Sequence, residues 1–408
     1  MKKYGLLGKK LDHSYSPEIH KMLGGYDYQL FERFENELDD FFRERDFDGI
    51  NVTTPYKKAV IPYCDVLSDA AERIGSVNTV VKLPDGRLFG DNTDYFGFRT
   101  LAERSGVSFA GKKALILGNG GVAPTVRCAL SDLGAEEIIN ISRSGENNYV
   151  NLSRHSDAQV IVNATPLGMY PNNGVSAVEL SDFSDCALVI DLIYNPARTK
   201  LILDAEKLGM KALGGLYMLV AQAARASELF CGSPVSDEKI EKVYKIMLTK
   251  MMNVALIGMP GCGKSSVARR IAEMTGRTLI DLDDEITKRL PFSIPEYFSV
   301  YGESGFRDIE TEVLRELSKQ SGAVIACGGG VVMRAENYEL LHQNSSIVFL
   351  RRELKNLPSD GRPLSLRHTP ARLAAVRMPL YDAWCDVTVD NCGTIGSAAA
   401  DICKKSGL

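Results

Sequence analysis

Short apolar runs rich in β-branched residues alternate along the chain with longer segments whose apolar residues recur at helical spacing. The short runs are typical of strands, and the longer segments are typical of amphipathic helices. The expected strands are Gly49–Thr53, Ala114–Leu117, Glu137–Ile141, Gln159–Asn163, Ala187–Ile190, Asn253–Ile257 and Ile347–Leu350. The clearest expected helices are Thr199–Leu208, Gly215–Phe230 and Gly263–Met274. This alternation predicts an α/β fold, in which parallel sheets carry helices on their faces.

The composition is that of a globular chain without an electrostatic footprint for nucleic acid. The 408 residues are 45% apolar and 25% charged, and the net charge of −4 comes from acids and bases that are mixed along the chain. We expect two or three compact domains and no nucleic-acid partner. No apolar stretch reaches the roughly 20 residues of a membrane span, so we expect no membrane partner.

The termini and the cysteines favour a cytoplasmic protein. Charged residues at Lys9, Lys10 and Asp12 interrupt the apolar run that a secretory signal would need. The nine cysteines are scattered, and none forms a CxxC pair. We therefore expect reduced thiols, not zinc ligands or a disulfide framework.

A glycine-rich turn, Gly258–Ser265, lies between the expected strand Asn253–Ile257 and a helix. In this context the turn predicts a P-loop, whose backbone N–H groups surround a β-phosphate. Lys264 would add positive charge at the transferring phosphate, and Ser265 would offer its hydroxyl to Mg²⁺. The turn therefore predicts a site for ATP and Mg²⁺.

Two carboxylates, Asp281 and Asp283, follow the next expected strand, Thr278–Ile280. Alternate residues of a strand face the same side, so we expect both carboxylates to face the nucleotide site. One could hold the metal shell while the other accepts a proton from an acceptor hydroxyl. The competing interpretation is that Asp283 caps a helix.

Three arginines and a glycine run complete the set of candidate residues in this region. Arg307 follows a phenylalanine, Gly328–Gly330 follows a strand, Arg362 lies in a turn, and Arg377 begins the string RMPLY. Glycines leave backbone amides bare for close approach of a ligand. Taken singly, each arginine is expected at the surface.

Together these motifs resemble the shikimate kinase family over Asn253–Leu408, because P-loop, DxD, FR, GGG, GRPL and RxPLY occur in that family's order. The residues that the resemblance implies for shikimate are Asp283, Arg307, Gly329 and Arg377. The aspartate would hold ring hydroxyls, the arginines would clamp the carboxylate, and the glycine would donate its N–H. The residues that it implies for ATP are Gly261, Cys262, Gly263, Lys264, Ser265, Ser266 and the lid arginine Arg362, with Ser265 and Asp281 at Mg²⁺.

The chain departs from this family at two places. Arg351–Pro358 is short where a longer helix usually leads into the lid. Asn391 follows Val389–Asp390, and the basic residue that often stacks on adenine there is missing. Both departures concern ATP binding and the lid more than the choice of substrate.

A second glycine-rich turn, Gly118–Gly121, follows the strand Ala114–Leu117 and opens a helix that ends near Leu133. A glycine turn at a helix N-terminus suits the pyrophosphate of a dinucleotide. The next strand, Glu137–Ile141, is followed by Ser-Arg-Ser with Arg143 at its centre. An arginine at this strand end, instead of an acid, favours the 2′-phosphate of NADP.

The first hundred residues contain no nucleotide loop, but polar clusters lie at the ends of their expected strands. The clusters begin at His13, Asn51, Ser76 and Gly90. Hydroxyls, amides, a lysine and carboxylates are the groups that a polyhydroxylated acid requires. Lys57 follows a proline, and we expect it to begin a helix, where it could protonate a forming alkoxide if a carboxylate orients it. As a lone lysine it is expected at the surface.

These clusters and several later strings resemble the shikimate dehydrogenase family from Met1 to about Lys250. The strings are SxS, NVTxPxK, GxVNT, GDNTD, GxGG, NATPxGM, DLIYNP and GxxMLVxQA, in that order. The resemblance implies a catalytic pair, Lys57 and Asp94, and further substrate residues at Ser14, Ser16, Thr53, Asn78, Tyr194 and Gln222. The residues that it implies for NADP(H) are Gly118, Asn119, Gly120, Gly121, Val122, Ser142, Arg143, Ser144, Leu192 and Gly215. Pro124, Ser142 and the short stretch from Ser144 to Asn163 depart from the family.

We therefore expect an N-terminal α/β substrate domain, a Rossmann-like NADP domain and a P-loop kinase domain with a parallel sheet. The expected ranges are 1–101, completed by about 216–250, then 102–215 and 252–408. The implied activities are NADPH-dependent reduction of 3-dehydroshikimate to shikimate and phosphorylation of shikimate to shikimate 3-phosphate. The alternatives are a broader quinate/shikimate dehydrogenase and a C-terminal part that is a kinase-derived regulatory module. The sequence leaves the oligomeric state open.

Overall fold

The computed structural model describes residues 2–11, 14–357 and 370–408. Its internal contacts divide the chain into two compact units. The first unit comprises Met1–Gly168, Val175–Tyr194 and Asp204–Met247, and the second comprises Met169–Gly174, Asn195–Leu203 and Leu248–Leu408. Within the described ranges, no helix has both the length and the apolar character that crossing a membrane requires.

The first unit begins with a mixed six-stranded sheet in the order β2-β1-β3-β5-β6-β4. The strands are β1 (Tyr4–Gly8), β2 (Tyr28–Glu32), β3 (Gly49–Val52), β4 (Val66–Leu67), β5 (Thr79–Lys82) and β6 (Leu88–Asp91). The helices associated with it are α1 (Ser16–Gly24), α2 (Leu38–Glu44), α3 (Asp69–Ile74), α4 (Thr93–Arg104) and α7 (Leu216–Cys231). Helix α8 (Asp237–Met251) follows α7, and the boundary between the two units falls within it. Although α7 comes more than a hundred residues later than α4, it packs against both α4 and α1. A late segment of the chain thus completes this layer.

The second sheet of this unit is fully parallel, in the order β11-β10-β9-β7-β8. Its strands are β7 (Lys113–Leu117), β8 (Glu137–Ile141), β9 (Val160–Asn163), β10 (Leu188–Asp191) and β11 (Lys211–Gly214), with helices α5 (Ala123–Asp132) and α6 (Lys200–Lys207). Ala114–Leu117 of the interior strand β7 are fully buried, as expected for a parallel strand that helices cover on both faces. The glycine turn after β7 and the Ser-Arg-Ser segment after β8 lie at the carboxyl edge of this sheet.

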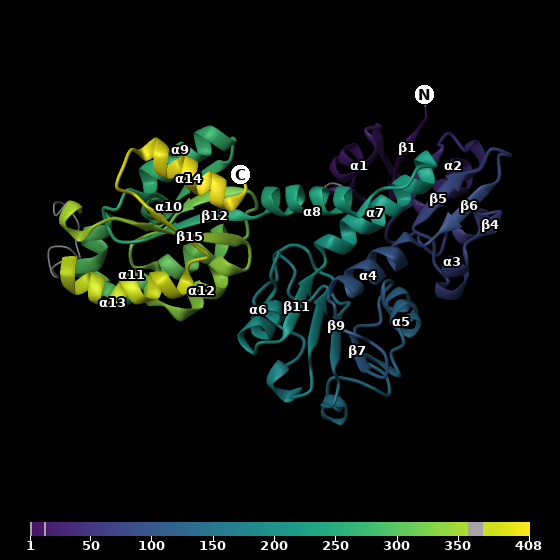
Figure 1. Cartoon of the computed structure of the whole chain (residues 1–408), viewed down its shortest axis with the longest axis horizontal. Helices are drawn as coiled ribbons and strands as arrows, with labels where there is room; N and C mark the ends of the chain where they lie inside the picture. Colours follow the sequence, from purple (N-terminus) through teal and green to yellow (C-terminus); the bar gives the residue numbers. More distant parts are fainter. Residues whose placement is uncertain (1, 12–13, 358–369) are drawn as a thin grey trace. The chain divides into compact units, whose positions relative to one another are not determined.

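The second unit is built on another fully parallel sheet, in the order β13-β14-β12-β15-β16. Its strands are β12 (Asn253–Ile257), β13 (Thr278–Asp281), β14 (Ala323–Ala326), β15 (Ser345–Arg351) and β16 (Val387–Asp390). Its helices are α9 (Lys264–Thr275), α10 (Leu282–Arg289), α11 (Ile294–Leu317), α12 (Ala335–His342), α13 (Pro370–Trp384) and α14 (Ile395–Ser406). Helices α9 and α14 cover one face of the sheet, and α11, α12 and α13 lie over the other (Figure 1).

The architecture confirms the predicted α/β class and its parallel sheets, and each strand expected from the sequence is present within a residue or two at either end. The helix expected at Lys57 is wrong, because residues 54–60 form turns. The carbonyl of Lys57 accepts from the N–H of Val77 at 2.8 Å, so it is not available to a helical partner four residues later.

Candidate active sites

A cavity of about 360 Å³ lies in the first unit, and it gathers every residue expected to bind the dehydrogenase substrate. Those residues come from segments far apart in the sequence: Ser14, Ser16, Thr53, Lys57, Asn78, Asp94, Tyr194 and Gln222. Three of the expected cofactor residues, Val122, Leu192 and Gly215, border the same cavity. The cavity thus places hydroxyls, amides and a charged pair next to one end of the predicted cofactor site.

Lys57 and Asp94 form an ion pair in this cavity, with Nζ 2.6 Å from Oδ2. Lys57 lies in the turn after β3, and Asp94 lies in the first turn of α4, which the Asn92 side chain caps. The two side chains are 25% and 14% exposed, so both reach the cavity without being free in solvent. The carboxylate holds the ammonium in one position, as a general acid requires.

A buried amide network supports the floor of this cavity. The Asn78 side-chain oxygen accepts from the Thr93 N–H at 2.6 Å, which ties the residue before β5 to the start of α4. Asn51, for which no role was expected, accepts from the Tyr28 hydroxyl at 2.7 Å and donates to Thr79 Oγ1 at 2.9 Å. Asn51 begins the string NVTxPxK, so its position was visible in the sequence although its partners were not.

The predicted cofactor loop has the geometry of a tight turn. Gly118 has φ of 105°, and a Cβ on it would lie 2.7 Å from Thr165 Cγ2. Asn119, Gly120 and Gly121 are exposed between β7 and α5. Gly215 admits no side chain either, because a Cβ there would lie 2.1 Å from the Leu192 carbonyl oxygen.

The segment after β8 is held by its own hydrogen bonds. Ser142 Oγ donates to the Ser144 carbonyl at 2.5 Å, and the Ser142 N–H donates to the Asn147 carbonyl at 3.2 Å. Arg143, between the two serines, is exposed. These three residues lie outside the cavity lining, at the edge where the ribose end of a dinucleotide is expected.

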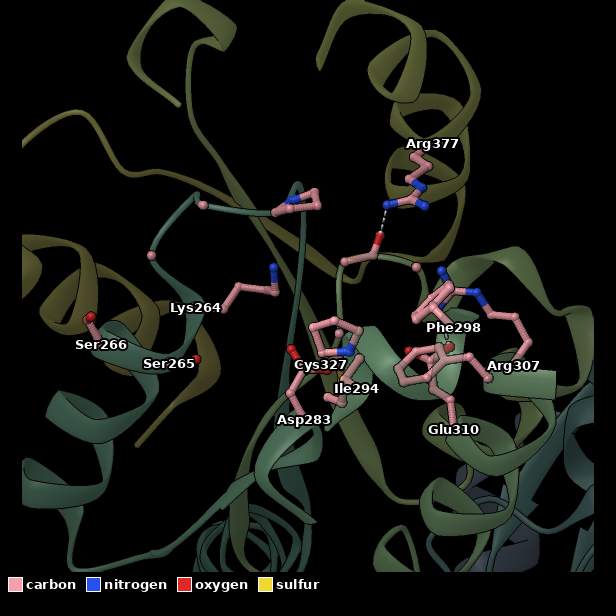
Figure 2. A pocket seen from close by; sticks show the side chains of 18 of the residues that line it. Lys264, Ser265, Ser266, Asp283, Ile294, Phe298, Arg307, Glu310, Cys327 and Arg377 are labelled. Carbon is pink, nitrogen blue, oxygen red and sulfur yellow. Dashed lines mark hydrogen bonds and ion pairs between the residues drawn. The ribbon is translucent and has the colours of Figure 1, made fainter. Parts of the chain in front are cut away.

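A second cavity, of about 570 Å³, lies in the second unit above the carboxyl ends of its strands. The expected residues that border it are Gly261, Gly263, Lys264, Ser265, Ser266, Asp283, Arg307, Gly329 and Arg377. Lys264 and Ser265 lie on one side, Arg307 and Arg377 lie on the other, and Asp283 lies between them (Figure 2). The predicted lid arginine, Arg362, falls outside the described residues.

The P-loop wraps tightly around the start of α9. Gly258, Gly261 and Gly263 have φ of 145°, 85° and 100°. Lys264 is buried, and its Nζ donates to the carbonyls of Gly258 at 2.9 Å and of Met259 at 3.1 Å. These hydrogen bonds hold the Lys264 ammonium inside the P-loop.

Two of the expected nucleotide-site residues lie beside the cavity and do not line it. Cys262 is fully buried, and its carbonyl accepts from the Asn391 side chain at 2.7 Å, so Asn391 holds the P-loop from behind. Asp281 ends β13 and caps α10, where its Oδ1 accepts from the Asp283 N–H at 3.1 Å. The expectation that both aspartates face the site by strand alternation is therefore wrong, because the chain turns into a helix at Leu282. The competing interpretation, that Asp283 caps a helix, is also wrong in its residue, because the cap of α10 is Asp281.

The arginines opposite the P-loop are buried, contrary to the expectation for single arginines. Arg307 is 5% exposed and pairs at 2.6 Å with Glu310, which was not among the expected site residues. Burial raises the pKa of the Glu310 carboxyl, and the Arg307 charge opposes this shift. Glu310 lies one helical turn after Arg307, a spacing that could have indicated the pair.

Arg377 fixes the glycine run. It is 2% exposed and donates to the Gly329 carbonyl at 3.1 Å, the contact drawn in Figure 2. The Tyr381 hydroxyl, one turn later on α13, donates to the same carbonyl. Burial lowers the pKa of Arg377, so an anion that enters the cavity compensates a charge that is otherwise poorly solvated.

Comparison with known proteins gives a family for each part of the chain. A family model described as shikimate kinase matches residues 260–405, and one described as the shikimate dehydrogenase substrate binding domain matches residues 6–80. A shikimate dehydrogenase (NADP(+)) of Clostridium perfringens is 36% identical over 266 residues, which cover 60% of this chain and 98% of that relative.

Solved structures agree with the sequence comparison. A chorismate mutase/shikimate 5-dehydrogenase fusion protein from Clostridium acetobutylicum aligns with a TM-score of 0.57 and 34% identity, covering 60% of this chain and 97% of that one. Shikimate 5-dehydrogenase from Thermus thermophilus, solved with NADP(H) and shikimate, aligns with a TM-score of 0.55 and 31% identity over 60% of this chain and 99% of that one. The chain therefore belongs to the shikimate dehydrogenase family and carries, after that part, a shikimate kinase domain.

Proposed function

We propose that this chain is a bifunctional enzyme that reduces 3-dehydroshikimate to shikimate with NADPH and then phosphorylates the 3-hydroxyl of shikimate with ATP and Mg²⁺. The observation that carries the proposal is the pair of cavities. One holds a Lys–Asp ion pair among hydroxyls and amides, and the other sets a P-loop opposite two buried arginines. Both arrangements suit a small polyhydroxylated carboxylic acid.

In the reductive site, Lys57 is proposed as the general acid. NADPH, when bound, supplies the hydride to the ring carbonyl. Lys57 Nζ then donates a proton to the forming alkoxide, and Asp94 keeps the ammonium aimed at that oxygen through their 2.6 Å contact. Ser14, Ser16 and Thr53 would hold the carboxylate and hydroxyls of the substrate.

The choice of cofactor is proposed to depend on the end of β8. NAD enzymes with this fold place an acid there for the ribose 2′-hydroxyl, whereas an arginine suits the 2′-phosphate of NADP. Here the strand is followed by Ser142-Arg143-Ser144, and Arg143 is exposed. Gly118 and its neighbours would approach the pyrophosphate at the start of α5.

In the kinase site, Asp283 is proposed to take the proton from the attacking hydroxyl, and Arg307 and Arg377 are proposed to hold the carboxylate. ATP, when bound, supplies the phosphoryl group that Lys264 stabilises. Mg²⁺ keeps several water ligands and needs only one or two protein ligands beside the phosphates. The Ser265 hydroxyl, which borders the cavity, would bind it directly, and the Asp281 carboxylate, which lies beside the cavity, would reach it through one of those waters.

The test of the proposal is to change Lys57 to Ala and measure both reactions on one preparation. General acid catalysis contributes roughly 10²- to 10⁴-fold, so we expect ketone reduction to fall by about that factor while phosphorylation of added shikimate stays within about twofold. Lys58→Ala is the matched control, because Lys58 is the exposed neighbour. Equal loss of both activities in Lys57→Ala would overturn the proposal of two separate sites.

A further inference from the structure

Arg352 borders the kinase cavity although no motif in the sequence singled it out. It is the first residue after β15, the strand that pairs with the P-loop strand β12. It lines the cavity together with Pro260, Gly261, Gly263 and Lys264. Because β15 pairs with the P-loop strand, Arg352 lies at the nucleotide end of the cavity.

Its neighbour Arg351 has a different environment. Arg351 pairs in bidentate fashion with Asp390 of β16, with Nε–Oδ1 at 2.6 Å and NH2–Oδ2 at 3.0 Å, and both side chains are about half exposed. Arg352 is half-buried and makes no hydrogen bond or ion pair with any residue that the structure describes. Arg351 is therefore paired and lies outside the cavity lining, whereas Arg352 borders the cavity and has no ion pair among the described residues.

The other arginines of the cavity are already engaged. Arg307 is compensated by Glu310 at 2.6 Å, and Arg377 donates to the Gly329 carbonyl. The cavity lining includes one lysine, Lys264, and its ammonium donates to backbone carbonyls of the P-loop. A triphosphate carries several negative charges, and a guanidinium matches phosphate oxygens in both geometry and charge.

We propose that Arg352 binds the triphosphate of ATP in the kinase site. Arg352 would supply positive charge to the nucleotide in a kinase domain that has Asn391, and not a basic side chain, after Val389–Asp390. The expected effect on the KM for ATP rests on the proposed kinase function. The expected effect on the Kd for ATP does not, since nucleotide affinity can be measured without turnover.

The experiment is a calorimetric titration of the full chain with Mg·ATP and with Mg·GTP. A charge-assisted hydrogen bond at a half-buried position corresponds to about a tenfold change in Kd. We expect Arg352→Ala to weaken ATP and GTP alike by about that factor and Arg352→Lys to weaken them less. Arg351→Ala, the matched control, should stay within about twofold for both nucleotides.

Activity measurements then separate the outcomes. In Arg352→Ala we expect the KM for ATP to rise with the Kd while the KM for shikimate and the dehydrogenase rate stay unchanged, which also shows that the chain is folded. Unchanged ATP affinity in Arg352→Ala would overturn the proposal, and so would a loss confined to ATP, since that result places Arg352 on the base. If the unaltered chain binds ATP through Arg352 but transfers no phosphate to shikimate, the kinase function fails and the binding role stands.

Discussion

At the scale of single residues, Arg143 is the clearest test of cofactor choice. It is exposed between two serines that are fixed by hydrogen bonds after β8. We expect Arg143→Ala to weaken NADPH about tenfold or more and NADH by less than twofold, because only NADPH carries the 2′-phosphate. Steady-state KM values for both cofactors check this, with the exposed Arg154→Ala as control. Equal losses for both cofactors would contradict the assignment.

The burial of His20 predicts that folding stability depends on pH. It is fully buried on α1, stacked on Tyr28 at 4.1 Å with Nδ1 2.7 Å from the Tyr26 hydroxyl, and burial lowers its pKa from 6.5 to about 3. Between these two pH values the unfolded chain binds a proton that the folded chain does not bind. Folding stability therefore falls as the pH is lowered from about 6.5 toward 3.

The change His20→Phe keeps a ring against Tyr28 but removes the titration. Between pH 6.5 and 5, we expect the free energy of unfolding of the unaltered chain to fall by about 1.6 kcal/mol more than that of the variant. Urea unfolding at the two pH values, with near-ultraviolet circular dichroism as the probe, measures this difference. Equal changes in the two proteins would show that His20 does not titrate on unfolding.

Residue types and their order could be predicted from the sequence much better than residue environments. The eight substrate residues from the dehydrogenase strings line one cavity, although no local pattern brings Ser14 and Gln222 to the same cavity. The burial of Arg307 could not be predicted, because it depends on Glu310 and on the packing of α11 against neighbouring elements. Arg352 lacked any motif, and only the pairing of β15 with β12 brings it to the P-loop.

At the scale of elements, the kink in α11 positions part of the kinase site. Gly302 interrupts the helix with φ of 69° and ψ of −172°, a conformation almost restricted to glycine. The segment after the kink carries Arg307 and Glu310 into the cavity. The direction of this segment, and with it the carboxylate clamp, depends on one glycine.

Gly302→Ala should therefore destabilise the second unit by about 1–3 kcal/mol, the usual cost of a strained backbone conformation. We also expect a higher KM for shikimate, because Arg307 would shift. Thermal unfolding and kinase kinetics measure the two effects. Ser299→Ala, an exposed change in the same helix, is the control. An unchanged melting temperature and KM in Gly302→Ala would show that the kink is not required.

Regular elements followed from the sequence where local pattern and tertiary packing agree. The apolar runs at Ala114–Leu117 and Asn253–Ile257 are strands because helices bury both of their faces. Turns and helix caps could be predicted from the sequence less well. Lys57 lies in a turn, where its carbonyl accepts from the Val77 N–H, and Asp281 caps a helix by accepting from the Asp283 N–H. The first outcome depends on a contact that the local sequence does not contain.

At the scale of the whole molecule, two sets of motifs imply consecutive reactions of one small acid. The first unit contains the cavity with Lys57 and Asp94, and the second contains the cavity with the P-loop. The described residues that line each cavity all belong to one unit. Shikimate formed at the first site is therefore expected to serve as substrate for the second without any residue being shared.

The most direct test of this account is a single assay of the full chain with 3-dehydroshikimate, NADPH, ATP and Mg²⁺. The loss of NADPH is followed by absorbance, and shikimate 3-phosphate is measured in the same samples by mass spectrometry. We predict that NADPH oxidation begins at once and that shikimate 3-phosphate follows with shikimate as a transient, reaching the amount of NADPH consumed. Oxidation of NADPH with accumulation of shikimate and no shikimate 3-phosphate would contradict the account.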